Sequence, residues 1–234
     1  MDTRWLFLWL EAPLQSWGAD SKFSRRDTLE FPTKSGVLGL VLCALGASGE
    51  QKELLARFAD LKQTVLSFND QKNDASLLHD FQMIGSGYNS DNPWEDLLIP
   101  KKNDGKAPVG GGTKLTHRYY LQNATFAVLL EVPADLAGSI SDSLLHPKYP
   151  IYLGRRCCVP TDFVYHGNYD SEELAENAAR EYAKEKDELL SVAFKVIDGE
   201  SSEGDVFTLN DVPLQFGTQK VYRDRRVTKI IDGT

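Results

Sequence analysis

The sequence predicts an α+β fold, in which a ferredoxin-like domain carries a projecting β-hairpin and a small β-rich C-terminal extension. Two patterns lead to this prediction. Between residues 4 and 145 a strand, a helix, two strands and a second helix follow one another, which is the start of the split βαβ arrangement. Residues 79–118 interrupt this order without apolar periodicity, and so long a stretch inside a domain is usually functional or disordered.

The first strand is expected at residues 4–11. Tryptophan, leucine and phenylalanine occupy both of its alternating faces. This pattern is typical of a central strand that is covered on each side.

The first helix is expected in the second half of residues 25–46, before Gly46, and this is the most apolar segment of the chain. Thr33 or Ser35 can act as the N-cap, and Gly46 stands where a C-cap is expected. Because the segment is apolar almost all round, we expect the helix to be largely buried.

Two glycines lie inside this helix, at Gly36 and Gly39. Each is unfavourable in a helix by about 1 kcal/mol relative to alanine. We interpret both as positions that another backbone approaches closely.

Basic side chains gather before this helix, at Arg25, Arg26 and Lys34, with the hydroxyl of Ser35 beside them. Cations beside the free N–H groups of a helix N-terminus form a site for phosphate or another anion. We therefore predict an anion site at the start of the helix. The alternative, which the residues leave open, is a buried helix whose basic N-terminal residues are only solvated.

The remaining elements follow from periodicity and from breaker residues. We expect a shorter helix at 50–61, strands at 64–68 and 125–132, a helix at 134–145 with Pro133 in its first position, an acidic helix at 172–190, and short strands at 192–197 and 206–209. The basic segment at 216–231 is interpreted as a strand with one basic face.

Residues 79–118 read as a hairpin arm that projects from a sheet, because strand patterns at 78–84 and 116–121 bound them. The stretch is rich in proline and glycine, and its lysines are Lys101, Lys102, Lys106 and Lys114. A tolerated surface insertion is the alternative.

The net charge of −8 argues by itself against a nucleic-acid partner, but the charge is unevenly distributed. The segments 170–190 and 198–211 each carry −5, which leaves +2 for the rest of the chain. An acidic lobe with a mildly basic remainder fits a protein that binds RNA on one face. It also fits a protein without a polyanion partner.

The sequence holds no CxxC pair, HExxH motif, Walker A loop or Rossmann fingerprint, so we expect neither a metal nor a cofactor. Three cysteines, of which Cys157 and Cys158 are adjacent, do not form a disulfide framework, and a cytoplasmic location is the default. The longest apolar run is too short to span a membrane.

Lys114, His117, Tyr119 and Tyr120 are the best catalytic cluster. Metal-independent RNA cleavage needs a base, an acid and a cation, which these residue types can supply. In an extended strand, however, His117 and Tyr119 share one face and Lys114 lies on the other. We therefore predict no catalytic site.

Arg155 and Arg156 follow Gly154 and are flanked by Tyr149 and Tyr152. Arginine with aromatic neighbours is the combination that binds single-stranded RNA, with guanidinium on phosphate and ring on base. The alternative is one surface arginine and one half-buried arginine paired with an acid. Further bases, among them Arg223 and Arg225, lie near the C-terminus.

Four ordered segments resemble a known family. They are 14–18 (LQSWG), 26–28 (RDT), 31–40 (FPTKSGVLGL) and 149–157 (YPIYLGRRC). Together they resemble the Cas-five (CasD-type) subunits of type I-E CRISPR Cascade complexes. The resemblance covers roughly residues 1–158, and the C-terminal third matches only through its basic ending.

This resemblance implies a non-catalytic RNA-binding subunit that caps the Cascade backbone and holds the 5′ handle of the CRISPR RNA. Residues 1–150 would form the ferredoxin-like (RNA-recognition-like) domain, including a thumb at 79–118 that displaces or kinks the RNA. Residues 151–234 would form the extension. The implied partners are the CRISPR RNA, the last backbone subunit, the large subunit and, indirectly, target DNA, with no membrane.

With this resemblance, the start of the first helix, the arm and the arginine pair become one expected RNA-binding surface. Its residues are Arg25, Arg26, Lys34, Ser35, Lys101, Lys102, Lys114, His117, Arg118, Tyr149, Tyr152, Arg155, Arg156, Arg223 and Arg225. Two alternatives remain. One is a nuclease that processes repeat RNA, as in type I-C relatives, and the other is a protein scaffold whose bases only pair with acidic neighbours.

Overall fold

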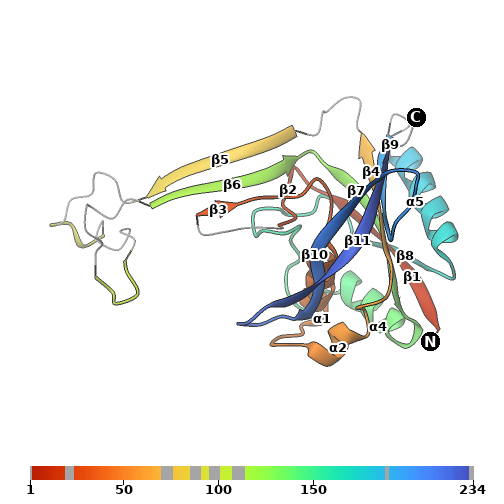
Figure 1. Cartoon of the computed structure of the whole chain (residues 1–234), viewed down its shortest axis with the longest axis horizontal. Coiled ribbons are helices and arrows are strands. Elements are labelled where there is room, and N and C mark those ends of the chain that lie inside the picture. The colour runs from red at the N-terminus through yellow and green to blue at the C-terminus, as the bar shows by residue number, and fades with distance from the viewer. Residues whose placement is uncertain are drawn as a thin grey trace.

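A seven-stranded antiparallel sheet with helices on both faces forms the body of the protein, and a β-ribbon extends from it (Figure 1). The structure is a computed structural model, which describes residues 2–18, 24–69, 76–84, 91–94, 101–106, 114–187 and 190–231. This architecture confirms the predicted α+β class. Within the described residues, no helix is long and apolar enough to cross a membrane.

Along the chain, the predicted first strand and first helix are both present, with two short strands between them. The elements are β1 (Thr3–Glu11), β2 (Leu14–Gln15), β3 (Arg25–Arg26), α1 (Lys34–Leu45), α2 (Lys52–Ala56), β4 (Gln63–Asn69), β5 (Ser76–Ile84), β6 (Lys114–Gln122), β7 (Thr125–Pro133), α4 (Ala134–Leu145), β8 (Tyr165–Tyr169), α5 (Glu172–Lys186), β9 (Ser191–Asp198), β10 (Asp205–Gln215) and β11 (Val221–Ile231). The order in the large sheet is β10-β11-β9-β4-β7-β1-β8.

β1 is covered on both faces, as its apolar pattern predicted. One face, which includes Leu6 and Leu8, packs in the core that α1 and α4 close. The other face, with Phe7 and Trp9, packs against the alanine stripe of α5. Both sets of side chains are almost fully buried, and this burial is the main stabilising contribution at the centre of the sheet.

The predicted caps of α1 are confirmed. The Thr33 side chain accepts a hydrogen bond from the Gly36 N–H group at 3.2 Å, and Gly46 ends the helix in the left-handed region with φ of +71°. These caps satisfy backbone groups that the helix ends leave open.

Two helices are shorter than predicted. α2 covers only Lys52–Ala56 of the expected 50–61, because Gln51 before it has φ of +54° and tight turns follow, with the Leu61 N–H group bonded to Phe58 O at 3.2 Å. α5 ends at Lys186 rather than at 190, since Asp187 is extended. Pro133 precedes α4 as its N-cap instead of starting it.

The residues after 150 add strands at both edges of the part of the large sheet that β1, β4 and β7 form. β8 pairs with β1, while β9 pairs with β4 and carries β11 and β10 beyond it. β10 runs to Gln215 and is much longer than the expected strand at 206–209.

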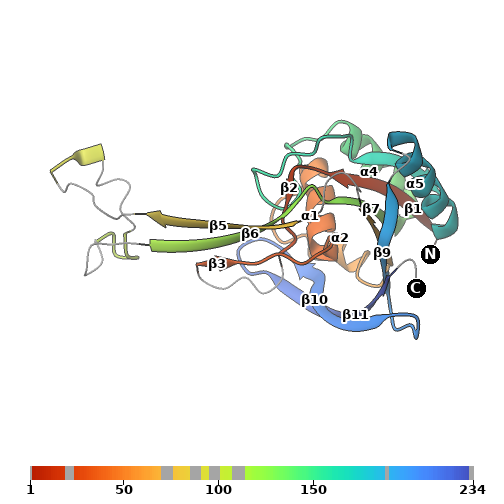
Figure 2. The same cartoon turned by 90° about the horizontal axis from the view of Figure 1, so that it is seen from above.

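The expected strands on either side of the arm are present and pair with each other. β5 and β6 run antiparallel from Ser76 opposite Gln122 to Ile84 opposite Lys114. β2 and β3 also pair with β6. Figure 2 shows this ribbon, seen from above, extending away from the large sheet. Of the intervening segment, only residues 91–94 and 101–106 belong to the described part of the chain.

An ion-pair network fastens α5 to β1 and to the loop before β8. Lys186 Nζ lies 2.5 Å from Glu11 Oε2 and 2.6 Å from Asp162 Oδ2, and the Tyr182 hydroxyl donates to Asp162 at 2.6 Å. Burial by itself raises the pKa of Asp162, but the hydrogen bonds from Lys186 and Tyr182 outweigh it and lower the pKa to about 2.

We predict that this network makes stability fall in acid. The pKa of Asp162 is lower in the folded state than its ordinary value of 3.8, so its contribution is complete above the unfolded pKa and is lost as the pH falls toward 2. Asp162→Asn should cost about 2 kcal/mol of unfolding free energy at pH 6 and about half as much at pH 3, as measured by urea titration. An equal cost at both pH values would show that the ionised carboxylate contributes nothing.

Candidate nucleic-acid interface

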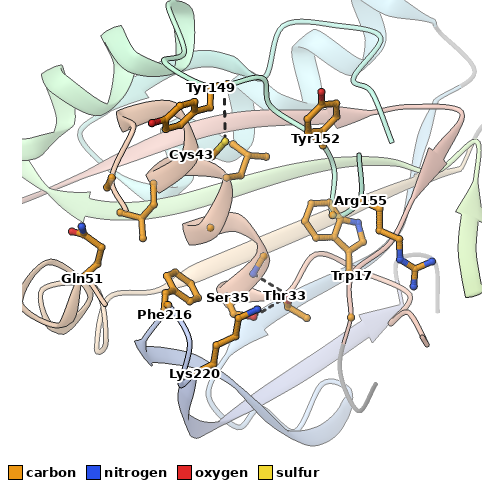
Figure 3. Close-up of a pocket in the computed structure, with 18 of the residues that line it drawn as sticks. Trp17, Thr33, Ser35, Cys43, Gln51, Tyr149, Tyr152, Arg155, Phe216 and Lys220 are labelled. Atoms are coloured by element: carbon orange, nitrogen blue, oxygen red, sulfur yellow. Dashed lines mark hydrogen bonds between the residues drawn. The ribbon is translucent and has the colours of Figure 1, made fainter. Parts of the chain in front are cut away.

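A groove with a cavity of about 630 Å³ lies along one face of α1 (Figure 3). α1 forms its floor, where Gly39 and Cys43 face the cavity. One wall comes from residues between 149 and 156, and the other from the turn and strand residues 216–222. The groove therefore joins three segments that are far apart in the sequence.

The two glycines of α1 have different roles, and neither meets another backbone as we had expected. A methyl group at Gly36 would lie 2.9 Å from the Trp17 ring and 2.9 Å from Thr33 Oγ1. A methyl group at Gly39 would meet no atom within 4 Å. Gly36 thus makes room for the Trp17 side chain, whereas Gly39 leaves the floor of the groove open.

Rings and cations border this groove. Tyr149 and Tyr152 stand on one side of it and Phe216 and Lys220 on the other, as Figure 3 shows. Rings of this kind can stack on bases, and cations can bind phosphates. The expected residues Ser35, Tyr149, Tyr152, Arg155 and Arg156 all line this single groove.

The loop that carries the arginine pair is held tightly against the segment at 15–17. Gly154 has φ of +99°, and a methyl group there would lie 1.8 Å from Ser16 O. The Ser16 N–H group donates to Leu153 O at 3.1 Å, and the Cys158 N–H group closes the turn on Arg155 O at 2.8 Å. Only glycine fits at position 154, because both the conformation and the contact exclude a side chain.

Arg155 is oriented by three contacts. Its guanidinium donates to Tyr119 O at 3.1 Å and to Arg26 O at 2.9 Å. It also lies over the Tyr120 ring, 4.5 Å from the centroid. These contacts link the groove to the base of the β5–β6 ribbon and fix the charge of Arg155 there, while the neighbouring Arg156 is exposed.

The predicted anion site at the start of α1 is taken by the protein's own carboxylate. Asp211 Oδ2 accepts a hydrogen bond from the Lys34 N–H group at 2.8 Å. The Lys34 side chain is only 2% exposed, and its ammonium donates to Leu61 O and to Ala59 O. Burial lowers the pKa of the Lys34 ammonium. The side chain that we expected at an open anion site is thus enclosed.

Two of the expected C-terminal arginines also make internal contacts. Arg225 is 9% exposed and pairs with Asp211 at 2.7 Å and with Asp198. Arg223 donates to Ala59 O at 2.8 Å and pairs with Asp60 at 2.7 Å. Arg225 therefore neutralises the buried Asp211 and the partly buried Asp198, while Arg223 lies at the surface beside an acid.

The remaining expected residues, including Arg25 and Arg26 that we expected beside the start of α1, lie on and beyond the ribbon. Arg25 and Arg26 form β3, which places them in register with His117 and Arg118. Lys101 and Lys102 belong to the exposed segment 101–106, and Lys114 begins β6, with its side chain outside the described residues.

The residues of the best catalytic cluster do not all share a face. The rings of His117 and Tyr119 both contact His79 and so lie on one face of the ribbon, whereas Tyr120 points to the other face and is buried. Among the residues that the structure describes, no group of three or more His, Cys, Asp or Glu side chains is arranged to hold a metal.

Sequence reasoning missed Trp17, Phe216, Lys220 and Tyr222 as groove residues. Trp17 belongs to the motif at 14–18, but no local sequence pattern indicates that its ring packs on Gly36. The basic C-terminal segment indicated Lys220, although not which of its bases face the groove. Asp211 gave no signal, since a single acid in an acidic segment is not distinctive.

A family model described as "CRISPR-associated protein (Cas_Cas5)" matches residues 5–228. The chain is a member of the Cas5 family. The family expected from the four motifs is confirmed. The match also covers most of the C-terminal third, which lies beyond those motifs.

One curated relative of this Cas5 chain is "CRISPR system Cascade subunit CasD" from Escherichia coli (strain K12). It is 29% identical over 166 residues, which cover 70% of each protein.

Two solved structures resemble this Cas5 chain over nearly its whole length. A chain of "CRISPR RNA-guided surveillance complex" is 27% identical with a TM-score of 0.70, covering 97% of this chain and 91% of that chain. "Crystal structure of Cas protein" is 25% identical with a TM-score of 0.59, covering 97% and 94%. The similarity to these two solved structures therefore agrees with the assignment to the Cas5 family.

We predict opposite effects for alanine at the two α1 glycines. Gly39→Ala should raise the unfolding free energy by up to about 1 kcal/mol, because alanine favours the helix and meets no neighbour. Gly36→Ala should lower it, because the methyl group displaces Trp17. Denaturant unfolding of both variants is the measurement, and a destabilised Gly39→Ala would mean that the groove floor is not open.

Proposed function

We propose that this Cas5 chain is a non-catalytic CRISPR RNA-binding subunit of a type I-E Cascade surveillance complex, acting in antiviral defence. In this role it holds the 5′ handle of the CRISPR RNA and caps the backbone of the complex. The observation that carries the proposal is the groove on α1, where rings and cations from three separate segments face one open cavity. Its CasD relative, a Cascade subunit, supports the assignment to this type of complex.

In the groove, exposed cations would bind phosphates and rings would stack on handle bases. Arg156 and Lys220 are the cations best placed for phosphates, and Tyr149 and Tyr152 supply the rings. Arg155 is already oriented by its backbone contacts, so less side-chain entropy is lost when RNA binds. We leave Lys34 and Arg225 out of the RNA-binding surface, because both are buried against carboxylates or carbonyls.

The charge distribution supports RNA binding on one face. The acidic helix α5 packs on the sheet face that carries Phe7 and Trp9, whereas α1 and the groove lie on the other face. The negative charge of α5 thus lies on the far side of the sheet from the groove. An approaching polyanion is steered toward the groove rather than toward α5.

We also propose the finer architecture expected from the sequence. The strands β1, β7 and β4, with α1 and α4, form the ferredoxin-like (RNA-recognition-like) domain within residues 1–150. β8, from the extension, adds the fourth strand, and the spatial order β8-β1-β7-β4 follows the split βαβ pattern. The β5–β6 ribbon is the thumb that displaces or kinks the RNA at the handle–spacer boundary. Residues 151–234 form the extension, and Arg26 and Arg118 contribute to the RNA surface at the base of the thumb.

The proposed partners are the CRISPR RNA, the last backbone subunit and the large subunit, with target DNA reached indirectly through the complex. The proposed location is the cytoplasm, without cofactor, metal or membrane attachment.

We expect Arg156→Glu to weaken binding of the protein's own CRISPR repeat RNA. One lost phosphate contact should reduce the slope of log affinity against log salt by roughly one unit. Lys184→Glu, on the exposed surface of α5, changes the net charge equally and should leave the slope unchanged. Fluorescence anisotropy titrations at several salt concentrations measure both.

Two results would contradict this assignment. Equal weakening by both variants would show that only the total charge matters. Salt-independent binding, or none, would favour the scaffold alternative, in which the bases only pair with acidic neighbours.

We further predict that the protein does not cut this RNA. In the cluster that resembles a nuclease site, the rings of His117 and Tyr119 stack on the His79 ring. Tyr120 is buried and points to the opposite face of the ribbon. Gel analysis after incubation with and without a chelator should show intact RNA. A single discrete cut that disappears in His117→Ala would establish the nuclease alternative instead.

A further inference from the structure

Two adjacent cysteines end the loop that carries the arginine pair. Sγ of Cys157 lies 4.0 Å from Sγ of Cys158, and the Cys157 thiol also points to the Tyr120 hydroxyl at 3.7 Å. Cys157 is exposed, whereas Cys158 is fully buried and belongs to the core. One sulfur is therefore open to a reagent in solution, and the second lies beside it.

The surroundings of this thiol pair are electropositive. Arg155 and Arg156 directly precede it, and the Arg155 guanidinium lies over the Tyr120 ring, 4.5 Å from its centroid. Nearby cations favour the thiolate form of a cysteine, and the thiolate is the form that reacts with oxidants. An exposed cysteine with cations around it and a second thiol beside it is typical of an oxidation-sensitive site.

The turn that holds the two cysteines also holds the arginines. The Cys158 N–H group donates to Arg155 O, and Cys158 O accepts from the Leu153 N–H group, each at 2.8 Å. Leu153 is fully buried, as Cys158 is, so both ends of the turn are anchored in the core. The positions of Arg155 and Arg156 beside the groove thus depend on the backbone conformation at the two cysteines.

A disulfide between the two cysteines does not fit this backbone without a change. The peptide bond that joins them is trans, and a trans peptide keeps neighbouring Cα atoms about 3.8 Å apart. Disulfides usually join Cα atoms that are roughly 4.4 to 6.8 Å apart, with sulfurs about 2.05 Å apart. Closing the gap of 4.0 Å between the sulfurs therefore distorts the turn. Strained or exposed disulfides are easily reduced again and are typical of regulatory bonds.

We propose that Cys157 and Cys158 form a reversible oxidation site, at which a peroxide joins the two sulfurs in a disulfide and thereby displaces the arginine pair from the groove. The part of this inference that concerns RNA rests on the proposed function. In a reducing cytoplasm the pair stays in the thiol form, and the disulfide is a transient response to oxidant.

The oxidation takes place in two steps, with hydrogen peroxide as the oxidant. First, the Cys157 thiolate attacks a peroxide oxygen, so that an S–O bond forms, the O–O bond breaks, and the leaving hydroxide takes up the thiol proton as water. Second, the Cys158 sulfur attacks the sulfur of this sulfenic acid. The S–S bond forms, the S–O bond breaks, and the hydroxide leaves as water with the Cys158 proton. The two thiols lose two electrons in total, and the peroxide is reduced to two waters.

The second step is coupled to the opening of the turn. Burial raises the pKa of the Cys158 thiol to about 11, so its thiolate forms readily only when the side chain leaves the core. Once the turn has opened, it no longer directs the Arg155 guanidinium to its acceptors, Tyr119 O and Arg26 O. Formation of the disulfide therefore changes the groove wall.

The first measurement needs no RNA. The reduced full chain is treated with hydrogen peroxide, the remaining thiols are alkylated with iodoacetamide, and the peptide that holds both cysteines is weighed by mass spectrometry. This peptide should lose two hydrogen atoms and carry no alkyl group, and dithiothreitol should restore both thiols. Cys43→Ser removes the third cysteine, which faces the groove, and should behave like the parent.

Two variants separate the two steps. Cys157→Ser should form no disulfide. In Cys158→Ala the sulfenic acid at Cys157 lacks its partner thiol, so it should accumulate and react with dimedone. Cys157→Ser changes an exposed side chain and keeps the test valid even if Cys158→Ala, which changes the core, does not fold.

The second measurement is binding of the protein's own CRISPR repeat RNA. The oxidised parent should bind about 10-fold more weakly than the reduced parent, and its salt slope should be lower by roughly one unit, because the phosphate contact of Arg156 is lost. Dithiothreitol should restore the affinity. Cys157→Ser should bind equally well before and after peroxide, which controls for oxidation elsewhere in the chain.

The outcomes separate this inference from the proposed function. A peptide that gains oxygen at Cys157 instead of losing two hydrogens refutes the oxidation site, whatever the RNA result. A disulfide that forms while RNA affinity stays the same refutes the displacement of the arginine pair. A reduced parent that binds no repeat RNA refutes the proposed function, and the mass measurement then decides the oxidation site by itself.

Discussion

The carboxylate of Asp211 connects the start of α1 with the C-terminal strands. It accepts a hydrogen bond from the Lys34 N–H group and pairs with Arg225 of β11. Because Asp211 is only 5% exposed, both interactions act in surroundings of low dielectric, where losing one partner is costly. α1 is the floor of the groove and the turn between β10 and β11 is part of its wall, so the shape of the groove depends on this carboxylate.

The elements whose signals are local could be predicted from the sequence. The two apolar faces of β1 and the caps of α1 depend on residues close together in the chain, and the structure has them where the pattern indicated. The length of β10 could not be predicted, because its pairing with β11 rather than its own pattern extends it to Gln215. α2 was overestimated, since leucines at helical spacing also suit the tight turns that follow it.

The same distinction applies to the site. Tyr149, Tyr152 and the arginine pair are neighbours in the sequence, and local reasoning brought them together. Burial of Lys34 could not be read from its basic surroundings, because the acceptors of its ammonium lie 25 and 27 residues away. The stacking of His79 on Tyr119 was also missed, since a histidine on β5 contacts this ring only through the pairing of β5 with β6.

The distance of 177 residues between Lys34 and Asp211 imposes an order on biosynthesis. α1 leaves the ribosome early, but the carboxylate that caps its first N–H group is made much later. Pairing between distant segments is slow to form, so the first N–H group of α1 stays without this partner until the C-terminal strands are synthesised. The groove is therefore finished only after Asp211 and the turn between β10 and β11 have been synthesised.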